Sequence, residues 1–187
     1  MSLNSYDVSA GLFIRGLTNL KMQLTKAQEH AISSGKDEAT LLEAQLATFG
    51  HTPSVSLSYA PTDLHMYTLA AQVHWAAEGA KLAISNLLGA QLTPATNIAK
   101  SFADLHQHID TAIAYFQDIA PSDLESGLDR TITIKHPRGS TSSSGRQFLI
   151  AFAIPHFFYH LTAAYGILRN QGVQLTMGDF LGNWGES

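Results

Sequence analysis

The chain has 187 residues, of which 45% are hydrophobic and 14% are charged, so it is long and apolar enough to bury the core of one globular domain over residues 1–187. Its formal net charge of -4 excludes the strongly basic surface that nucleic acid or an anionic membrane requires, and we expect neither partner. It contains no cysteine, which leaves His, Asp and Glu as the strong metal ligands.

The N-terminal third indicates one long helix and one short helix. Apolar residues recur at spacings of three and four over residues 5–33, which is the periodicity of a helix that packs one face against a core. Ser34 and Gly35 end this helix, and Asp37 caps a short second helix that carries Leu41 and Leu42. The polar, proline-containing residues 49–61 are expected to form a surface loop.

Two further long helices are expected in the middle of the chain. Thr62 or Asp63 caps a helix that continues to Leu88, with Gly89 as its stop. The next helix begins near Thr93 and Pro94, since proline is favoured in a first helical turn, and it ends before Pro121.

The pattern changes after this point. Residues 131–134 alternate polar and apolar side chains, residues 135–146 are typical of a turn, and residues 147–150 form a second apolar run, which together predict a small β-hairpin. Residues 152–169 are apolar nearly all round and predict a buried helix, after which residues 173–187 are expected to pack along the outside.

These elements predict an all-α fold: a four-helix bundle with a short extra helix and a small β-hairpin before the last helix. The first fourteen residues lack the basic start of a signal peptide, and no run of about 20 apolar residues suggests a membrane span. We therefore expect a cytoplasmic protein.

Histidines carry the strongest chemical signal. His156 and His160 are four residues apart, so on a helix both imidazoles project from one face and can hold one metal ion. Random placement of nine histidines gives about 0.4 such pairs, so the alternative of one buried, hydrogen-bonded histidine and one solvated histidine stays open.

A metal site in a bundle core needs a third ligand from a facing helix, and His74 is the best candidate because it lies near the middle of its helix. His65 ranks second. Glu78, one turn beyond His74, would be a fourth ligand or would orient an imidazole, although an exposed glutamate on the helix surface is the commoner interpretation. His106 and His108 are two residues apart, point in opposite directions on a helix, and are expected at the surface.

Several segments resemble an uncharacterised bacterial family that is grouped with the DinB/YfiT-like metalloenzymes. They are residues 17–20, 26–31, 39–43, 72–73, 158–169, 172–173 and 179–182, of which FYHLTAAYGILR at 158–169 is the most specific. The resemblance implies a DinB-like four-helix bundle. It also implies a divalent ion such as zinc or nickel on His74, His156 and His160, although relatives closest in the C-terminal block often have Asn in place of His156.

Two functional hypotheses follow. In the first, the protein is a metal-dependent hydrolase or thiol transferase that acts on an unknown small molecule, and any thiol arrives with the substrate because the chain has no cysteine. Glu78 and Tyr165 are weak candidates for a general base, and we assign neither. In the second, the protein is a non-catalytic homodimeric bundle that binds a partner or small ligand without a metal.

Overall fold

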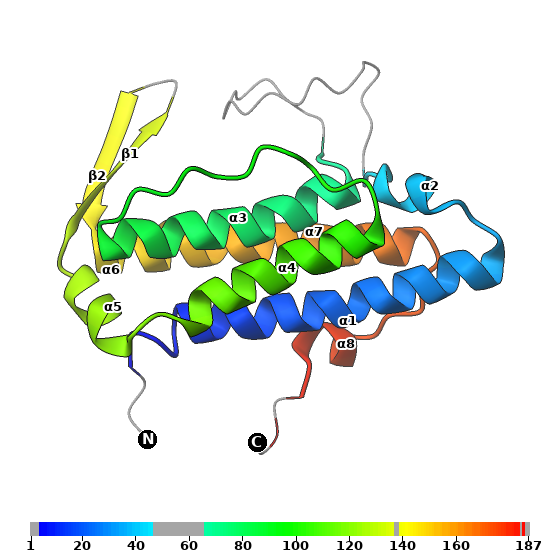
Figure 1. Cartoon of the computed structure of the whole chain (residues 1–187), viewed down its shortest axis with the longest axis horizontal. Coiled ribbons are helices and arrows are strands. Elements are labelled where there is room, and N and C mark those ends of the chain that lie inside the picture. Colours follow the sequence, from blue (N-terminus) through cyan, green and yellow to red (C-terminus); the bar gives the residue numbers. More distant parts are fainter. Residues whose placement is uncertain (1–3, 47–65, 137–138, 184, 186–187) are drawn as a thin grey trace.

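Four long helices lie side by side in the computed structural model (Figure 1), which describes residues 4–46, 66–136, 139–183 and 185. These helices are α1 (Ala10–Ser34), α3 (Leu69–Leu88), α4 (Phe102–Gln117) and α7 (Ile154–Asn170). α3 packs along α7 and α4, while α1 packs along α4 and α7. The fold is mostly helical. α3 is central to it, because α3 contacts each of the other three long helices.

Shorter elements connect the long helices. They are α2 (Glu38–Leu42), α5 (Pro121–Gly127), strands β1 (Thr131–His136) and β2 (Gly139–Ser144), α6 (Gly145–Phe148), the π-helical turn η1 (Leu149–Ala153) and α8 (Met177–Leu181). β1 and β2 pair antiparallel and form a two-stranded hairpin at one end of the long helices (Figure 1). The expected β-hairpin is therefore present, and its first strand lies where the sequence predicts it, but its second strand lies at residues 139–144.

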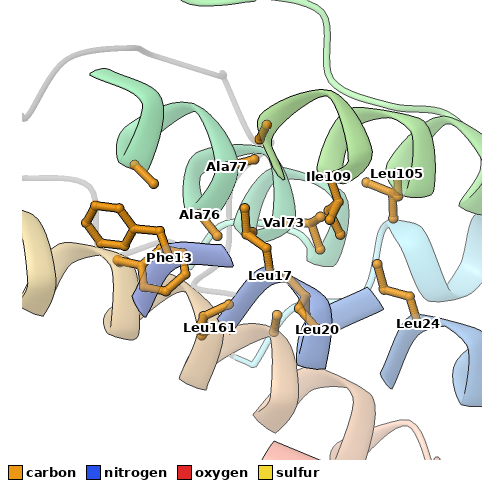
Figure 2. Close-up of a cluster of buried hydrophobic side chains, with 14 of the residues drawn as sticks. Phe13, Leu17, Leu20, Leu24, Val73, Ala76, Ala77, Leu105, Ile109 and Leu161 are labelled. Carbon is orange, nitrogen blue, oxygen red and sulfur yellow. The ribbon is translucent and has the colours of Figure 1, made fainter. Parts of the chain in front are cut away.

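The core lies where the long helices meet. Figure 2 shows the periodic apolar residues of α1 directed toward α3, α4 and α7, with Phe13, Leu17, Leu20 and Leu24 in successive turns. All four are at most 1% exposed. Spacings of three and four place these side chains on one helix face, so burial of that face against three neighbours accounts for the position of α1.

Two helices begin later than the sequence suggests. α3 begins at Leu69, where the Thr68 hydroxyl accepts a hydrogen bond from the Ala71 N–H, whereas the expected caps Thr62 and Asp63 lie outside the described residues. α4 begins at Phe102, because Ser101 caps the Asp104 N–H. The expected start at Thr93 and Pro94 is wrong: residues 90–100 instead form a strap without regular structure, which leads from α3 to α4.

The second hairpin strand was expected at residues 147–150, and this expectation is also wrong. The Gly/Ser/Thr run of β2 pairs with β1 instead, with Thr133 opposite Ser142. The Ser144 hydroxyl accepts the Gln147 N–H and starts a helix there. The Ser144 cap therefore outweighs the strand preference of the apolar residues 147–150, which lie in the first turns of the last helical segment.

This last helical segment runs without a break from Gly145 to Asn170 through α6, η1 and α7. The π-helical turn at Leu149–Ala153 ends two residues before Pro155, which lacks the N–H that a regular helix would use. By length and composition the segment is long and apolar enough to cross a membrane, contrary to the expectation that no such run exists. A core helix meets the same criteria, and α7 packs against α3 and α1.

Near the C-terminus, Met177–Leu181 form the short helix α8, which packs along α1 on the outside of the long helices, as the sequence suggests. Thr176 and Asp179 cap this helix reciprocally, and Lys26 of α1 pairs with the Asp179 carboxylate at 2.6 Å. The hydrogen bond from Lys26, together with the one from the Thr176 backbone N–H, lowers the pKa of Asp179 to about 2. α8 is therefore tied to α1 on the side away from the hairpin (Figure 1).

The base of the hairpin depends on two glycines that bring three backbones together. A Cβ on Gly145 would overlap the Gly127 carbonyl, and a Cβ on Gly127 would overlap the Leu87 carbonyl of α3. We expect Gly145→Ala to lower the free energy of unfolding by about 1–3 kcal/mol, because backbone cannot yield as a flexible side chain does. Urea denaturation measures this change. Gly178→Ala is the matched control: its nearest neighbour is a hydroxyl at 3.4 Å, and since Gly178 lies in the helix α8 the change should leave stability unaltered or raise it by up to about 1 kcal/mol.

Candidate functional site

His156 and His160 lie together on one face of α7, as their spacing predicts. Their Nε2 atoms are 3.2 Å apart and their ring centroids are 4.5 Å apart. His160 is 3% exposed, whereas His156 is half-buried. The two imidazole nitrogens therefore converge on one point at the wall of the helix pair α3 and α7.

Gln72 of α3 fixes the orientation of His160. The Gln72 side-chain oxygen lies 2.7 Å from His160 Nδ1, and the Gln72 amide nitrogen donates to the Tyr67 carbonyl at 3.4 Å. Because the amide nitrogen has this second partner, the oxygen faces His160 and accepts its Nδ1 proton. The lone pair of His160 is then on Nε2 and points toward His156.

Both histidines are neutral at physiological pH. Burial, together with the neighbouring His156, lowers the pKa of His160 to about 3, and burial lowers the pKa of His156. Aromatic rings contribute to this burial, since Phe152 stacks on His156 and Tyr67 stacks on His160. Neutral imidazoles with free lone pairs are the form that binds metal ions.

A cavity of about 560 Å³ opens beside the pair, between α3, the η1–α7 segment and β1. Its wall is mainly apolar and aromatic. The lining residues are Tyr67, Trp75, Gly79, Leu82, Ala83, Asn86, Thr133, Ile134, Lys135, Phe148, Phe152, Ala153, His156, Tyr159 and His160. Its volume lies within the range of about 300–1,000 Å³ that is typical of small-molecule sites.

Gly79 makes room for the His156 ring. A Cβ at this position would lie 2.7 Å from His156 Cε1 and 2.9 Å from Nδ1. Gly79 is seven residues beyond Gln72, so both occupy nearly the same face of α3, the face turned to α7. The glycine therefore permits the ring to lie directly against the α3 backbone.

His74, the expected third metal ligand, faces away from the pair. It is two residues from Gln72, which on a helix rotates the side chain by about 200 degrees. Its ring stacks on His108 of α4 with centroids 5.0 Å apart, and it hydrogen-bonds the backbone of Ala95. It lines a different pocket, under residues 96–100. Among the described residues, no three His, Asp or Glu side chains are grouped so as to hold a metal ion.

Glu78 belongs to this second cluster and is fully buried. It accepts from Lys81 Nζ at 2.8 Å and from the Ala95 N–H at 2.9 Å, and its carboxylate lies 3.4 Å from His108 Nε2. Burial alone would raise its pKa, but the hydrogen bonds from Lys81 and Ala95 leave the pKa below its ordinary value. Glu78 and His74 thus hold the strap of residues 90–100 against α3.

The remaining histidines and Tyr165 lie elsewhere. His108 is not the surface residue that the sequence indicated, and burial lowers its pKa and that of His106. His65 lies outside the described residues. The Tyr165 hydroxyl accepts from Arg169, and its ring contacts Phe180 of the C-terminal segment. Gln72 and Gly79, which shape the site, were missed because neither residue type carries a chemical motif.

A family model described as a domain of unknown function, DUF1993, matches residues 5–181. The chain belongs to the DUF1993 family. A solved structure, described as the crystal structure of a DinB family member protein from Shewanella denitrificans, is similar over 97% of this chain and 94% of that chain, with a TM-score of 0.79 and 29% sequence identity. The comparison with curated proteins finds no match. These findings show that this DUF1993 chain has a DinB-like fold.

The buried state of His160 predicts a pH-dependent stability. Its pKa is about 3 in the folded chain and about 6.5 when unfolded, so the unfolded chain binds more protons between these values and stability falls as pH decreases below about 6.5. We expect His160→Gln to reduce the loss of unfolding free energy between pH 7 and pH 5 by up to about 2 kcal/mol. Urea denaturation at both pH values measures it. An unchanged loss in the variant would contradict a neutral, buried His160.

The close approach at Gly79 predicts an unusual response to alanine. Gly→Ala inside a helix ordinarily stabilises by about 1 kcal/mol, but at this position the methyl group displaces the His156 ring, so we expect no gain or a loss. Gly166→Ala on α7 is the matched control, because a Cβ at Gly166 would meet only the flexible end of the Leu46 side chain, at 3.3 Å. This variant should show the ordinary gain in stability. Equal gains in both variants would place the His156 ring elsewhere.

Proposed function

We propose that this protein is a DinB-like metal-binding protein in which His156 and His160 hold one divalent ion, Zn²⁺ or Ni²⁺, at the wall of a small-molecule cavity. The observation that carries the proposal is the convergence of the two Nε2 atoms at 3.2 Å. Two nitrogens bound at about 2.1 Å to one tetrahedral ion lie roughly 3.4 Å apart, so the spacing fits. Imidazole suits both zinc and nickel.

The surroundings of the pair support the same proposal. Metal-binding histidines usually give their second ring nitrogen to an oxygen acceptor, and Gln72 supplies one to His160. Since both rings are neutral, no proton has to be removed at pH 7 before an ion binds. Two protein ligands leave positions open for water or for a donor on the bound small molecule.

A bound ion would supply Lewis-acid polarisation of a carbonyl or an acidified water. This chemistry suits a hydrolase, or a transferase whose thiol arrives with the substrate. The residues of this chain would bind, orient and exclude water: the aromatic wall holds the apolar part of a ligand, and Gln72 holds His160 in place. We also interpret the four long helices as the four-helix bundle of DinB-like proteins.

A metal-free binding protein is the second candidate function, and the same 3.2 Å contact favours it. Because Gln72 accepts the Nδ1 proton of His160, His160 Nε2 is an acceptor and His156 Nε2 can donate to it. The histidines would then be a neutral hydrogen-bonded pair in the wall of a ligand cavity. A homodimeric state and a cytoplasmic location remain predictions under either function.

Metal binding separates the two functions. We expect protein without an affinity tag, loaded with Zn²⁺ or Ni²⁺, to retain about one ion per chain by elemental analysis, and His156→Ala and His160→Ala each to weaken binding at least about tenfold in calorimetric titration. His136→Ala on the hairpin is the control and should bind as the unmodified chain does. If the unmodified chain retains no stoichiometric ion, metal binding is overturned and the metal-free binding protein is the function that remains.

The contribution of His74 is tested in the same experiment. Because His74 faces α4 and hydrogen-bonds Ala95, His74→Ala should lower stability but keep the metal affinity. A loss of affinity equal to that of His160→Ala would instead assign His74 as a ligand, as the three-histidine prediction requires.

A further inference from the structure

The strand β1 presents an open edge beside the candidate site. Antiparallel pairs alternate between residues that exchange hydrogen bonds and residues whose N–H and C=O point outward. The Gly145 N–H donates to the Arg130 carbonyl at 2.8 Å, which places residue 130 in the bonded set. Given the register of Thr133 with Ser142, Thr133 and Lys135 belong to the outward set. Their backbone N–H and C=O groups are therefore outside the ladder.

This open edge borders the cavity. Thr133, Ile134 and Lys135 all line it, although side chains along a strand alternate between two faces. The Thr133 hydroxyl bonds the Ser142 hydroxyl at 2.8 Å across the exposed face of the hairpin, whereas Ile134 packs on the core. Three consecutive residues can line one cavity when the edge of the strand faces it. The groups offered there are thus backbone amides.

The rest of the cavity wall is suited to an apolar group. Trp75 of α3 and the stacked pair Phe148 and Phe152 provide aromatic surface. Asn86 adds one polar group: its amide nitrogen donates to the Leu82 carbonyl at 2.8 Å, and its side-chain oxygen is not engaged in that bond. At about 560 Å³ the cavity holds a small molecule and has no room for a long peptide.

We propose that the ligand is a short, extended amide: an N-acylated apolar amino acid or a dipeptide. Its amide pairs with the backbone of Thr133 as an added strand would, and its apolar side chain packs against Trp75 and Phe152. Main-chain pairing of this kind supplies affinity, while the pocket for the side chain supplies specificity. The inference rests on the proposed function in one respect, the use of the same cavity, and it requires no metal.

Proline substitutions on the two edges of the hairpin test this pairing. Thr133→Pro removes the N–H on the edge of β1 that borders the cavity. Ser142→Pro removes the equivalent outward N–H on the other edge of the hairpin, and Ser142 is not among the residues that line the cavity. Both are made in a Trp184→Phe background, so that Trp75 is the remaining tryptophan and its fluorescence reports binding. The probe is N-acetylphenylalanine methylamide, titrated with a chelator present.

We expect the background protein and Ser142→Pro to bind the probe with the same Kd, and Thr133→Pro to bind it about three- to tenfold more weakly, the loss of one net hydrogen bond. Equal weakening by both prolines, no weakening by Thr133→Pro, or no binding to the background protein overturns the inference. A second arm needs no variant: the methyl ester of N-acetylphenylalanine, which lacks one N–H donor, should bind more weakly than the methylamide.

The two proposals fail separately. Amide binding that persists with chelator, together with an absence of stoichiometric zinc or nickel, would retain the amide site and reject the metal. Conversely, amide binding that requires the ion and is indifferent to Thr133→Pro would assign recognition to the histidine pair and reject the strand edge.

Discussion

The structure depends on how α3 satisfies its buried polar side chains. α3 contacts each of the other three long helices, and an unpaired polar group buried there would cost about 1–3 kcal/mol. Each such group therefore bonds a partner: Gln72 bonds His160, Glu78 bonds Lys81 and Ala95, and Ser85 bonds the Ala90 carbonyl. These bonds hold α7 on one face and the strap of residues 90–100 on another, and the cavity beside His156 and His160 lies along the first face.

Helical phase divides these roles between the faces. Gln72 and Gly79 are seven residues apart and share the face turned to α7, whereas His74 and Glu78 share the face turned to α4. The histidine that the sequence proposed as a third ligand is thus separated from the pair by rotation about the helix axis. The rotation of about 200 degrees that separates His106 from His108 also separates Gln72 from His74. The sequence does not say which of these two faces of α3 meets α7, and the contact between Gln72 and His160 shows it.

The sequence predicts the helical character of the fold and the pairing of His156 with His160 well, because both follow from short-range periodicity. It predicts element boundaries poorly where a single capping side chain decides them, as at Thr68, Ser101 and Ser144. Residues 147–150 resemble a strand by composition, yet the Ser144 cap makes them helical. Gln72 and Gly79 join the candidate site only through long-range contacts with His160 and His156, which no local pattern in one sequence contains.

The charge of the cavity constrains what the proposed ion must bring with it. Two neutral imidazoles leave the full charge of a divalent ion uncompensated. Among the described residues that line the cavity, the one with a formal charge is Lys135, which is also positive. A low-dielectric wall of aromatic rings strengthens this imbalance. An ion bound there would therefore favour an anionic companion, either a deprotonated water or a carboxylate on the ligand. The carboxylate of an N-acylated amino acid would supply that charge, so the metal and amide proposals are compatible within one ligand.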